Sequence, residues 1–205
     1  MAEIVLYASK ASRSLAGYWI LEELGIPYKV VDVDLRDRKH LEPEFLKINP
    51  SGRVPVVSVD GVIVSERPAI CAFLADRFGY GSLAPKIDSR DRGAYLKWLT
   101  YATAVIDPAI AVRASNLDRP LRHTTWDTAQ RAVDILGQAF EGQAWLLGDR
   151  FTAADVVVGS VITMARFKDL LPESRVLDDY GDRLKERPAF QRAERLTWPP
   201  ELFQD

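Results

Sequence analysis

The sequence predicts an α/β domain followed by an all-helical domain. Before residue 80 the chain alternates strand and helix patterns in the order β-α-β, loop, β-β-α, and after residue 88 only helical patterns follow. The segment between them, Tyr80–Asp88 (YGSLAPKID), combines glycine, serine and proline and is therefore the predicted linker. The expected domains are residues 1–80 and 88–205.

The first domain is predicted to begin with a β-α-β unit. Ile4–Tyr7 is a short run of apolar β-formers, which is typical of a buried strand. Apolar residues recur at helical spacing from Leu15 to Leu24, and Gly25 stops this helix. Tyr28–Val33 (YKVVDV) again has the pattern of a strand. A strand, a helix and a strand in succession predict a parallel pair with a right-handed crossover.

The rest of the first domain is predicted to be a short helix, a hairpin and a longer helix. The short helix is Leu41–Ile48, and the two strands are Val54–Val59 and Gly61–Val64. Asp60-Gly61 between the strands is a strong hairpin signal. Pro68–Phe78 has an apolar stripe at helical spacing. In the second domain, helices are expected over Asp91–Ala114, Thr124–Glu141, Ala153–Asp169 and Asp178–Arg183.

Composition excludes several classes of protein. The net charge of −2, from 27 Lys and Arg against 29 Asp and Glu, disfavours a nucleic-acid binder or a polybasic membrane adsorber. One cysteine, Cys71, and two histidines make a disulfide or a metal site unexpected. The longest apolar run, Val156–Ala165, is shorter than the roughly 20 residues that span a bilayer. With no secretory signal at the N-terminus, we expect a soluble cytoplasmic protein without a metal.

The Val54-Pro55 dipeptide at the start of a strand is a candidate docking point for a peptide. If the Val54–Pro55 bond is cis, the Val54 N–H and C=O point sideways and can pair with an extended peptide. The alternative is an ordinary trans proline that begins an edge strand. The dipeptide alone favours this alternative, because only about 5–6% of X-Pro bonds are cis.

The segment Ser65–Ile70 (SERPAI) is suited to a zwitterionic ligand. Pro68 fits the first turn of a helix, and a helix N-terminus favours an anion. The Arg67 guanidinium can take a carboxylate, and Glu66 can accept a hydrogen bond from an ammonium group. The alternative is that Glu66 only complements the helix dipole while Arg67 is solvated.

Three serines, Ser9, Ser12 and Ser14, lie in the turn between the first strand and the first helix. Open α/β sheets place ligands there, beyond the carboxyl end of a strand and near a helix N-terminus. Serine is also an ordinary N-cap, and the sequence favours this role for at least one of them, Ser14 being nearest the helix. Thr152 and Asp155 have the spacing of a capping box, to which we assign a structural role.

In combination and order, these features resemble the cytosolic glutathione transferase family over essentially the whole chain. Within that family, the sequence is most similar in character to bacterial members. The resemblance implies a thioredoxin-like N-terminal domain and a cis bond between Val54 and Pro55. It is carried by five segments: LGIPY at 24–28, EFLKINPSGRVP at 44–55, ERPAI at 66–70, GDRFTAAD at 148–155 and RPAF at 187–190.

The resemblance also implies how glutathione is bound. Val54 would hold the cysteinyl main chain, and Glu66 would contact the γ-glutamyl ammonium group. Arg67 stands where the family usually has a serine that binds the γ-glutamyl carboxylate. His40 lies where theta- and phi-like members have a histidine near the glycyl carboxylate, and Arg53 stands where Gln or Lys is usual.

The implied activity is conjugation of the glutathione thiolate to a small hydrophobic electrophile. The electrophile is expected near the first helices of the second domain, with Tyr101, Ile106 and Arg113 as candidate lining residues, ordinary helix packing being the alternative. A second possible function on this fold is glutathione-dependent isomerisation, dehalogenation or ether cleavage. A third is that of a binding protein without turnover. The family also implies detoxification and a C2 homodimer, which the many apolar positions of the Pro68–Phe78 and Asp91–Ala114 helices support modestly, Tyr95 and Trp98 among them.

Ser12 is the hydroxyl expected to activate glutathione, because it matches the serine of theta- and phi-like members. A free thiol has a pKa of about 8.5, and lowering this pKa by about two units requires roughly 2.7 kcal/mol of preference for the anion. One hydrogen bond to a charged group supplies roughly 1.5–3 kcal/mol. Tyr7, which ends the first strand where alpha-, mu- and pi-like members have a catalytic tyrosine, is the competing candidate, and a site that needs neither is the third outcome.

Overall fold

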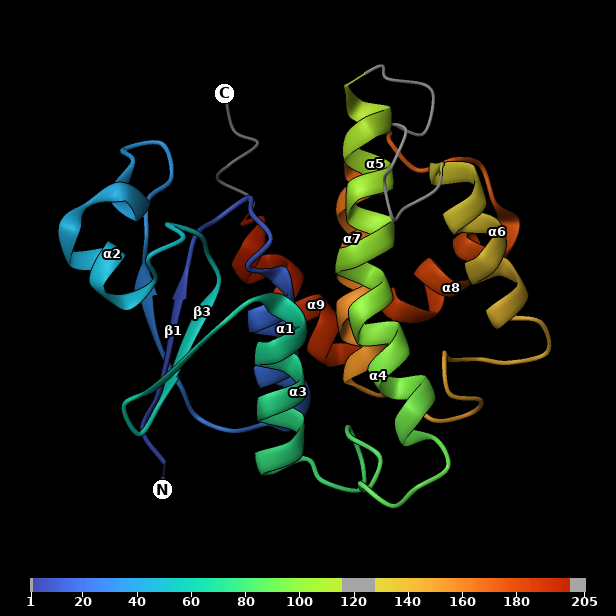
Figure 1. Cartoon of the computed structure of the whole chain (residues 1–205), viewed down its shortest axis with the longest axis horizontal. Helices are drawn as coiled ribbons and strands as arrows, with labels where there is room; N and C mark the ends of the chain where they lie inside the picture. Colours follow the sequence, from blue (N-terminus) through green and yellow to red (C-terminus); the bar gives the residue numbers. More distant parts are fainter. Residues whose placement is uncertain (1, 116–127, 200–205) are drawn as a thin grey trace. The chain divides into compact units, whose positions relative to one another are not determined.

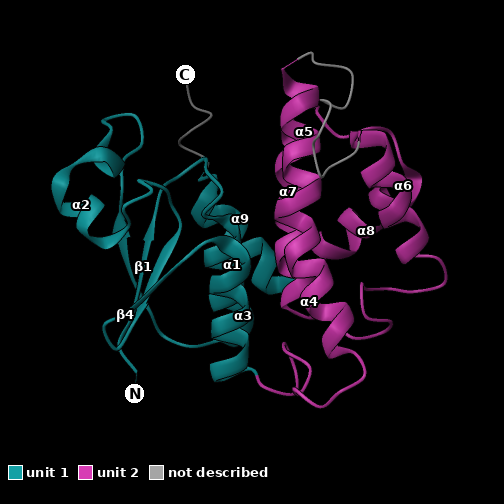
Figure 2. Ribbon diagram, in the orientation of Figure 1, with its two compact units in different colours: residues 1–79, 187–205 teal, residues 80–186 magenta. Residues whose placement is uncertain are grey.

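The computed structural model describes residues 2–115 and 128–199 and is drawn in Figure 1. The chain divides into two compact units, residues 1–79 with 187–205 and residues 80–186 (Figure 2). The first unit contains β1 (Ile4–Ala8), α1 (Leu15–Leu24), β2 (Lys29–Asp32), the 3-10 helix η1 (Lys39–Leu41), α2 (Pro43–Ile48), β3 (Val56–Val59), β4 (Val62–Ser65), α3 (Arg67–Phe78) and α9 (Pro188–Thr197).

The first unit is built on a mixed sheet in the order β2-β1-β3-β4. Strands β1 and β2 are parallel, which confirms the predicted β-α-β unit, and the other neighbouring pairs are antiparallel. Asp60 and Gly61 both have positive φ, at 51° and 83°, as a tight hairpin turn requires. The predicted fold class is therefore confirmed.

Helices cover both faces of this sheet (Figure 1). The side chains of β1 alternate, so that Leu6 and Ala8 are fully buried on the face that α1 covers. A Cβ on Gly17 of α1 would lie 2.9 Å from the Leu6 Cδ1 atom. Tyr7 points to the other face, where its ring meets Phe45 of α2 edge-on at 6.3 Å. The absence of a side chain at position 17 therefore allows α1 to approach the sheet closely.

Helix α9 completes the first unit by packing on α1, although no helix was predicted after Arg183. The Trp19 and Phe190 rings meet edge-on, with centroids 4.7 Å apart. Arg187 donates two hydrogen bonds of 2.7 Å to the two carboxylate oxygens of Glu23, whose side chain is only 7% exposed. Pro188 is well suited to start α9 because the first turn of a helix needs no proline N–H.

In the described part of the second unit, the helices are joined by loops and by isolated β-bridges, without a strand. This unit contains α4 (Arg92–Tyr101), the π-helical turn η2 (Ala102–Ile106), α5 (Asp107–Ala114), α6 (Ala129–Ala139), α7 (Ala153–Phe167) and α8 (Arg175–Lys185). The predicted helix Asp91–Ala114 corresponds to α4, η2 and α5 in succession. The wide η2 turn precedes Pro108, whose ring and missing N–H do not fit a regular α-helix. Residues 124–127 of another predicted helix lie outside the described residues.

Helix α7 is the central helix of the second unit and packs against α4 and α8. Its residues are almost all buried, which explains its long apolar sequence. Tyr95 and Trp98 of α4 are 0% and 4% exposed, so they belong to the core of their own unit. Their apolar character is therefore explained by this core. The modest support for a dimer interface that was expected from these two residues is not found.

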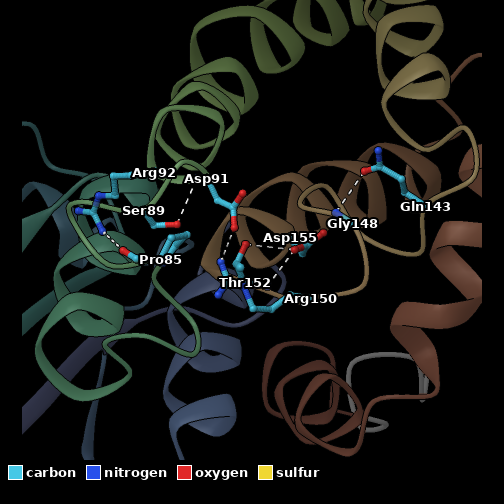
Figure 3. A network of polar contacts seen from close by, with 9 residues as sticks. All are labelled: Pro85, Ser89, Asp91, Arg92, Gln143, Gly148, Arg150, Thr152 and Asp155. Atoms are coloured by element: carbon cyan, nitrogen blue, oxygen red, sulfur yellow. Dashed lines mark hydrogen bonds and ion pairs between the residues drawn. The ribbon is translucent and has the colours of Figure 1, made fainter.

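A polar network fixes the start of α7 (Figure 3). Thr152 and Asp155 form the predicted capping box, in which the Thr152 Oγ1 atom accepts a hydrogen bond from the Ala154 N–H and Asp155 accepts one from the Thr152 N–H. Nearby, Arg150 and Asp91 form an ion pair at 3.0 Å. In the described part of the chain, no helix has the length and apolar character needed to cross a membrane.

Candidate functional site

The predicted site residues gather at one end of the sheet in the first unit. In the strand register, Tyr7 of β1 pairs with Val56 of β3, and Val56 pairs with Ser65 of β4. The serine turn follows Tyr7, Val54-Pro55 precedes Val56, and Glu66-Arg67 follows Ser65. Three motifs that are far apart in the sequence therefore meet at this end of the strands, which is referred to below as the sheet edge.

The serine turn contains a closed ring of hydrogen bonds. The Ser9 N–H donates to the Ser14 Oγ atom at 3.1 Å, the Ser14 and Ser12 hydroxyls are 2.9 Å apart, and the Ser12 hydroxyl donates to the Ser9 C=O at 2.7 Å. The Ser14 N–H also donates to the Ser12 Oγ atom, at 3.1 Å. Ser12 has a single proton and two possible acceptors, the Ser9 C=O at 2.7 Å and the Ser14 Oγ atom at 2.9 Å. With this proton on the closer acceptor, the Ser9 C=O, the contact between the two hydroxyls is made by the proton of Ser14.

The ring corrects the expectation that Ser14 caps α1. Ser14 does occupy the N-cap position, but its side chain makes no capping hydrogen bond. Its hydroxyl is fully buried and directed back into the turn, toward Ser9 and Ser12. Ser14 was therefore misassigned from the sequence, because helix proximity was the only signal available there.

The turn is also attached to helix α9. The Ala11 N–H donates to the Thr197 C=O at 2.7 Å, and Ala11 has a positive φ of 48°. Thr197 is fully buried and its hydroxyl donates to the Ala193 C=O. The last turn of α9 therefore helps to fix the conformation of the turn that contains Ser12.

Tyr7 lies in a different environment from Ser12. It packs, half-buried, against a cluster of Val33, Phe45 and Val56. Among the described residues, none makes a hydrogen bond with the Tyr7 hydroxyl, whereas the proton of Ser12 is already donated to Ser9. The structure thus leaves both hydroxyls as candidates for a thiol.

The Val54–Pro55 peptide bond is cis, as predicted. The loop before it is held by Asn49, which is 5% exposed and donates from Nδ2 to the Arg53 C=O at 2.7 Å. Within the described chain, the Val54 main chain has no hydrogen-bond partner. Its N–H and C=O are therefore available to an added peptide. Asn49 was not singled out from the sequence, although it belongs to an obvious turn.

His40 and Arg53 are both close to Gly52, the first in space and the second in sequence. A Cβ on Gly52, which has a φ of +60°, would lie 3.1 Å from the His40 carbonyl oxygen. Gly52 therefore allows the His40 segment and the loop to pack together. The His40 Nδ1 atom is buried and lacks a hydrogen-bond partner in the described structure, whereas Arg53 is exposed.

Glu66 and Arg67 mark the start of α3. Glu66 is exposed and has an unusual backbone conformation for a non-glycine residue, with φ at 68° and ψ at 123°. Its C=O accepts the first hydrogen bond of the helix, from the Ile70 N–H at 2.8 Å. Arg67 is only 8% exposed. A carboxylate and a guanidinium therefore occupy neighbouring positions at this helix start, as the zwitterion prediction requires.

Cys71 lies one turn along α3 and is unsuited to nucleophilic chemistry. Burial raises the pKa of the Cys71 thiol to about 12, and the charge of Arg67 offsets this only in part. The thiol is fully buried, and its Sγ atom lies 3.8 Å from the Ala16 C=O. Among the described residues, no group of three or more His, Cys, Asp or Glu side chains is arranged to hold a metal ion.

Two family models match the chain and decide its family. Residues 14–77 match the glutathione S-transferase N-terminal domain, and residues 94–192 match the glutathione S-transferase C-terminal domain. The chain belongs to the glutathione S-transferase family. Its relatives in this family are enzymes, and the residues at the sheet edge occupy the region that the N-terminal model covers or adjoins.

The names of this chain's relatives indicate more than one activity. Glutathione S-transferase GstA of Escherichia coli O157:H7 is 28% identical over 92% of this chain and 96% of its own length. Maleylacetoacetate isomerase of Pseudomonas aeruginosa is 29% identical over 85% of this chain and 87% of its own. A glutathione transferase homolog from Lodderomyces elongisporus, crystallised with two glutathione molecules per subunit, shares the fold with a TM-score of 0.79 and 22% identity over 97% of this chain and 99% of its own.

Proposed function

We propose that this protein conjugates glutathione to small hydrophobic electrophiles. The observation that supports this most is the meeting of three motifs at one sheet edge: the serine turn, the free Val54 main chain and the Glu66-Arg67 pair. Each suits a different part of glutathione, namely its thiol, its cysteinyl peptide and its zwitterionic γ-glutamyl end. Family membership makes glutathione the tripeptide to test first.

In this proposal, the Val54 main chain pairs with the cysteinyl residue and directs its sulfur toward the serine turn. Glu66 accepts hydrogen bonds from the ammonium group, and Arg67 binds the neighbouring carboxylate. His40 and Arg53 lie toward the glycyl end. The thiolate then attacks the electrophilic carbon, a carbon–sulfur bond forms, and the leaving group departs with its electron pair.

Ser12 is the proposed activating residue. To donate to sulfur, its hydroxyl has to rotate away from the Ser9 C=O. The exchange replaces a neutral hydrogen bond, with a net value of about 0.5–1.5 kcal/mol, by one to an anion, with about 1.5–3 kcal/mol. The N-terminus of α1 adds about 0.3–1 kcal/mol. Together they favour the thiolate without a general base.

We expect Ser12→Ala to raise the pKa of the bound glutathione thiol by about one unit, a tenfold loss of thiolate at acidic pH. Tyr7→Phe, the matched removal of the other hydroxyl, is expected to leave this pKa within about 0.3 unit. Thiolate absorbance against pH measures both variants. If Tyr7→Phe raises the pKa and Ser12→Ala does not, Tyr7 has the activating role.

Glutathione-dependent isomerisation is the second candidate, because the chain resembles an isomerase as closely as it resembles a transferase. The same site would serve, with the thiolate adding to a double bond and leaving again after rotation. Product analysis separates the two, since conjugation consumes glutathione and isomerisation returns it. A C2 homodimer, a cytoplasmic location, detoxification and an electrophile site in the 88–205 domain belong to the same proposal and rest on family membership.

A further inference from the structure

The hydrogen-bond ring in the serine turn assigns a role to Ser14. Ser14 is fully buried, and its side chain contacts both other serines of the ring. Its oxygen accepts from the Ser9 N–H at 3.1 Å and lies 2.9 Å from the Ser12 Oγ atom. Because the single proton of Ser12 is given to the closer Ser9 C=O, the hydrogen bond between the two hydroxyls is made by the proton of Ser14.

Ser14 also acts on Ser12 through its main chain. The Ser14 N–H donates to the Ser12 Oγ atom at 3.1 Å, so this oxygen receives two hydrogen bonds from one residue. Both remain when the Ser12 hydroxyl rotates from the Ser9 C=O toward a ligand. A hydroxyl that accepts hydrogen bonds becomes a stronger donor, because the bonds polarise one another.

We propose that Ser14 is a positioning residue that holds the Ser12 oxygen and strengthens its hydroxyl as a donor to the glutathione thiolate. This inference rests on the proposed function, in which Ser12 contacts the sulfur. Ser14 itself does not touch glutathione. Its side chain acts only through Ser12, and this distinguishes a positioning role from a second activating hydroxyl.

The attachment of the turn to α9 supports a fixed geometry. Ala11, between Ser9 and Ser12, is held by its hydrogen bond to the Thr197 C=O. With the main chain fixed at Ala11, loss of the Ser14 hydroxyl changes the hydrogen bonding of Ser12 while the turn is kept in place. A Ser14→Ala variant is therefore expected to fold.

The test is the thiol pKa of bound glutathione in a double-mutant cycle of Ser12 and Ser14. We expect Ser14→Ala to raise this pKa by about half a unit, which is about a twofold loss of thiolate at pH 6.5. In the Ser12→Ala background, the same change is expected to have no further effect, because Ser14 acts through Ser12. Ser160→Ala is the matched control: Ser160 is also buried and donates to a main-chain carbonyl, but in the other unit.

Three outcomes overturn parts of this account and can be told apart. If Ser12→Ala raises the thiol pKa and Ser14→Ala does not, the role of Ser14 is wrong and that of Ser12 stands. If Ser14→Ala raises the pKa equally with and without Ser12, Ser14 acts directly on the ligand or on the turn. If Ser12→Ala itself has no effect, the proposed activation by Ser12 fails, and the role of Ser14 fails with it.

Discussion

Replacement of Asp155 by Ala is expected to lower the free energy of unfolding by about 3–4 kcal/mol. Asp155 is fully buried, and its carboxylate accepts hydrogen bonds from the Leu146 N–H, the Thr152 N–H and the Tyr180 hydroxyl. Alanine leaves the Leu146 and Thr152 N–H groups without this acceptor in a buried place and removes the capping box of α7, the central helix of its unit. Urea unfolding measures the change.

Asp134→Ala is the matched control for this prediction, because Asp134 is exposed on α6. It is expected to change stability by less than about 0.5 kcal/mol. If Asp155→Ala costs no more than this control, the capping box does not stabilise the second unit.

The contribution of Asp155 also depends on pH. Burial raises the pKa of its carboxyl from 3.8 to about 6, although its hydrogen bonds act in the opposite direction. The folded chain therefore binds more protons than the unfolded chain between these pH values. The stability that Asp155 contributes declines as pH rises from about 4 to about 6 and is constant above. The stability difference from Asp155→Asn should show this slope, and a flat difference would contradict the raised pKa.

Replacement of Gly17 by Val is expected to destabilise the first unit by about 2–3 kcal/mol. A Cβ at position 17 already lies 2.9 Å from Leu6 Cδ1 and 3.2 Å from Pro55 Cβ, and valine adds two methyl groups. Because Pro55 follows the docking residue Val54, glutathione binding should weaken as well. Urea unfolding and calorimetric titration measure the two effects.

Gly137→Val is the matched control, since a Cβ on Gly137 of α6 meets nothing within 4 Å. Valine has a slightly higher helix propensity than glycine, so this variant is expected to be neutral or slightly more stable. Equal effects at positions 17 and 137 would show that α1 does not need glycine for its close approach to the sheet.

The elements predicted correctly from the sequence are those whose signals are local. The Asp60-Gly61 hairpin and the Thr152–Asp155 capping box depend on residues a few positions apart, and both formed as expected. Helix α9 was not predicted, because its apolar stripe has meaning only against α1. The two segments are far apart in the sequence, since the hydrogen-bonded residues Arg187 and Glu23 are separated by 164 positions.

The residues of the site were predicted from the sequence. The features that were not predicted depend on contacts between residues in three dimensions. The cis bond at Val54–Pro55 came from the family resemblance, since the dipeptide alone favoured trans. Ser14 was taken for a helix cap, because a sequence does not show which of several nearby donors a buried hydroxyl meets. The need for glycine at position 17 of α1 becomes clear only from the sheet residues that lie against it.

Proton release on glutathione binding is the most direct test of the central claim that this sheet edge binds glutathione and lowers the pKa of its thiol. Calorimetric titration at pH 7 in two buffers of different ionisation enthalpy measures it, with S-methylglutathione as the control that has no thiol. If the thiol pKa falls by about two units, binding should release about 0.7 proton with glutathione and none with the S-methyl compound. Absence of binding, or equal proton release with both ligands, would contradict the account.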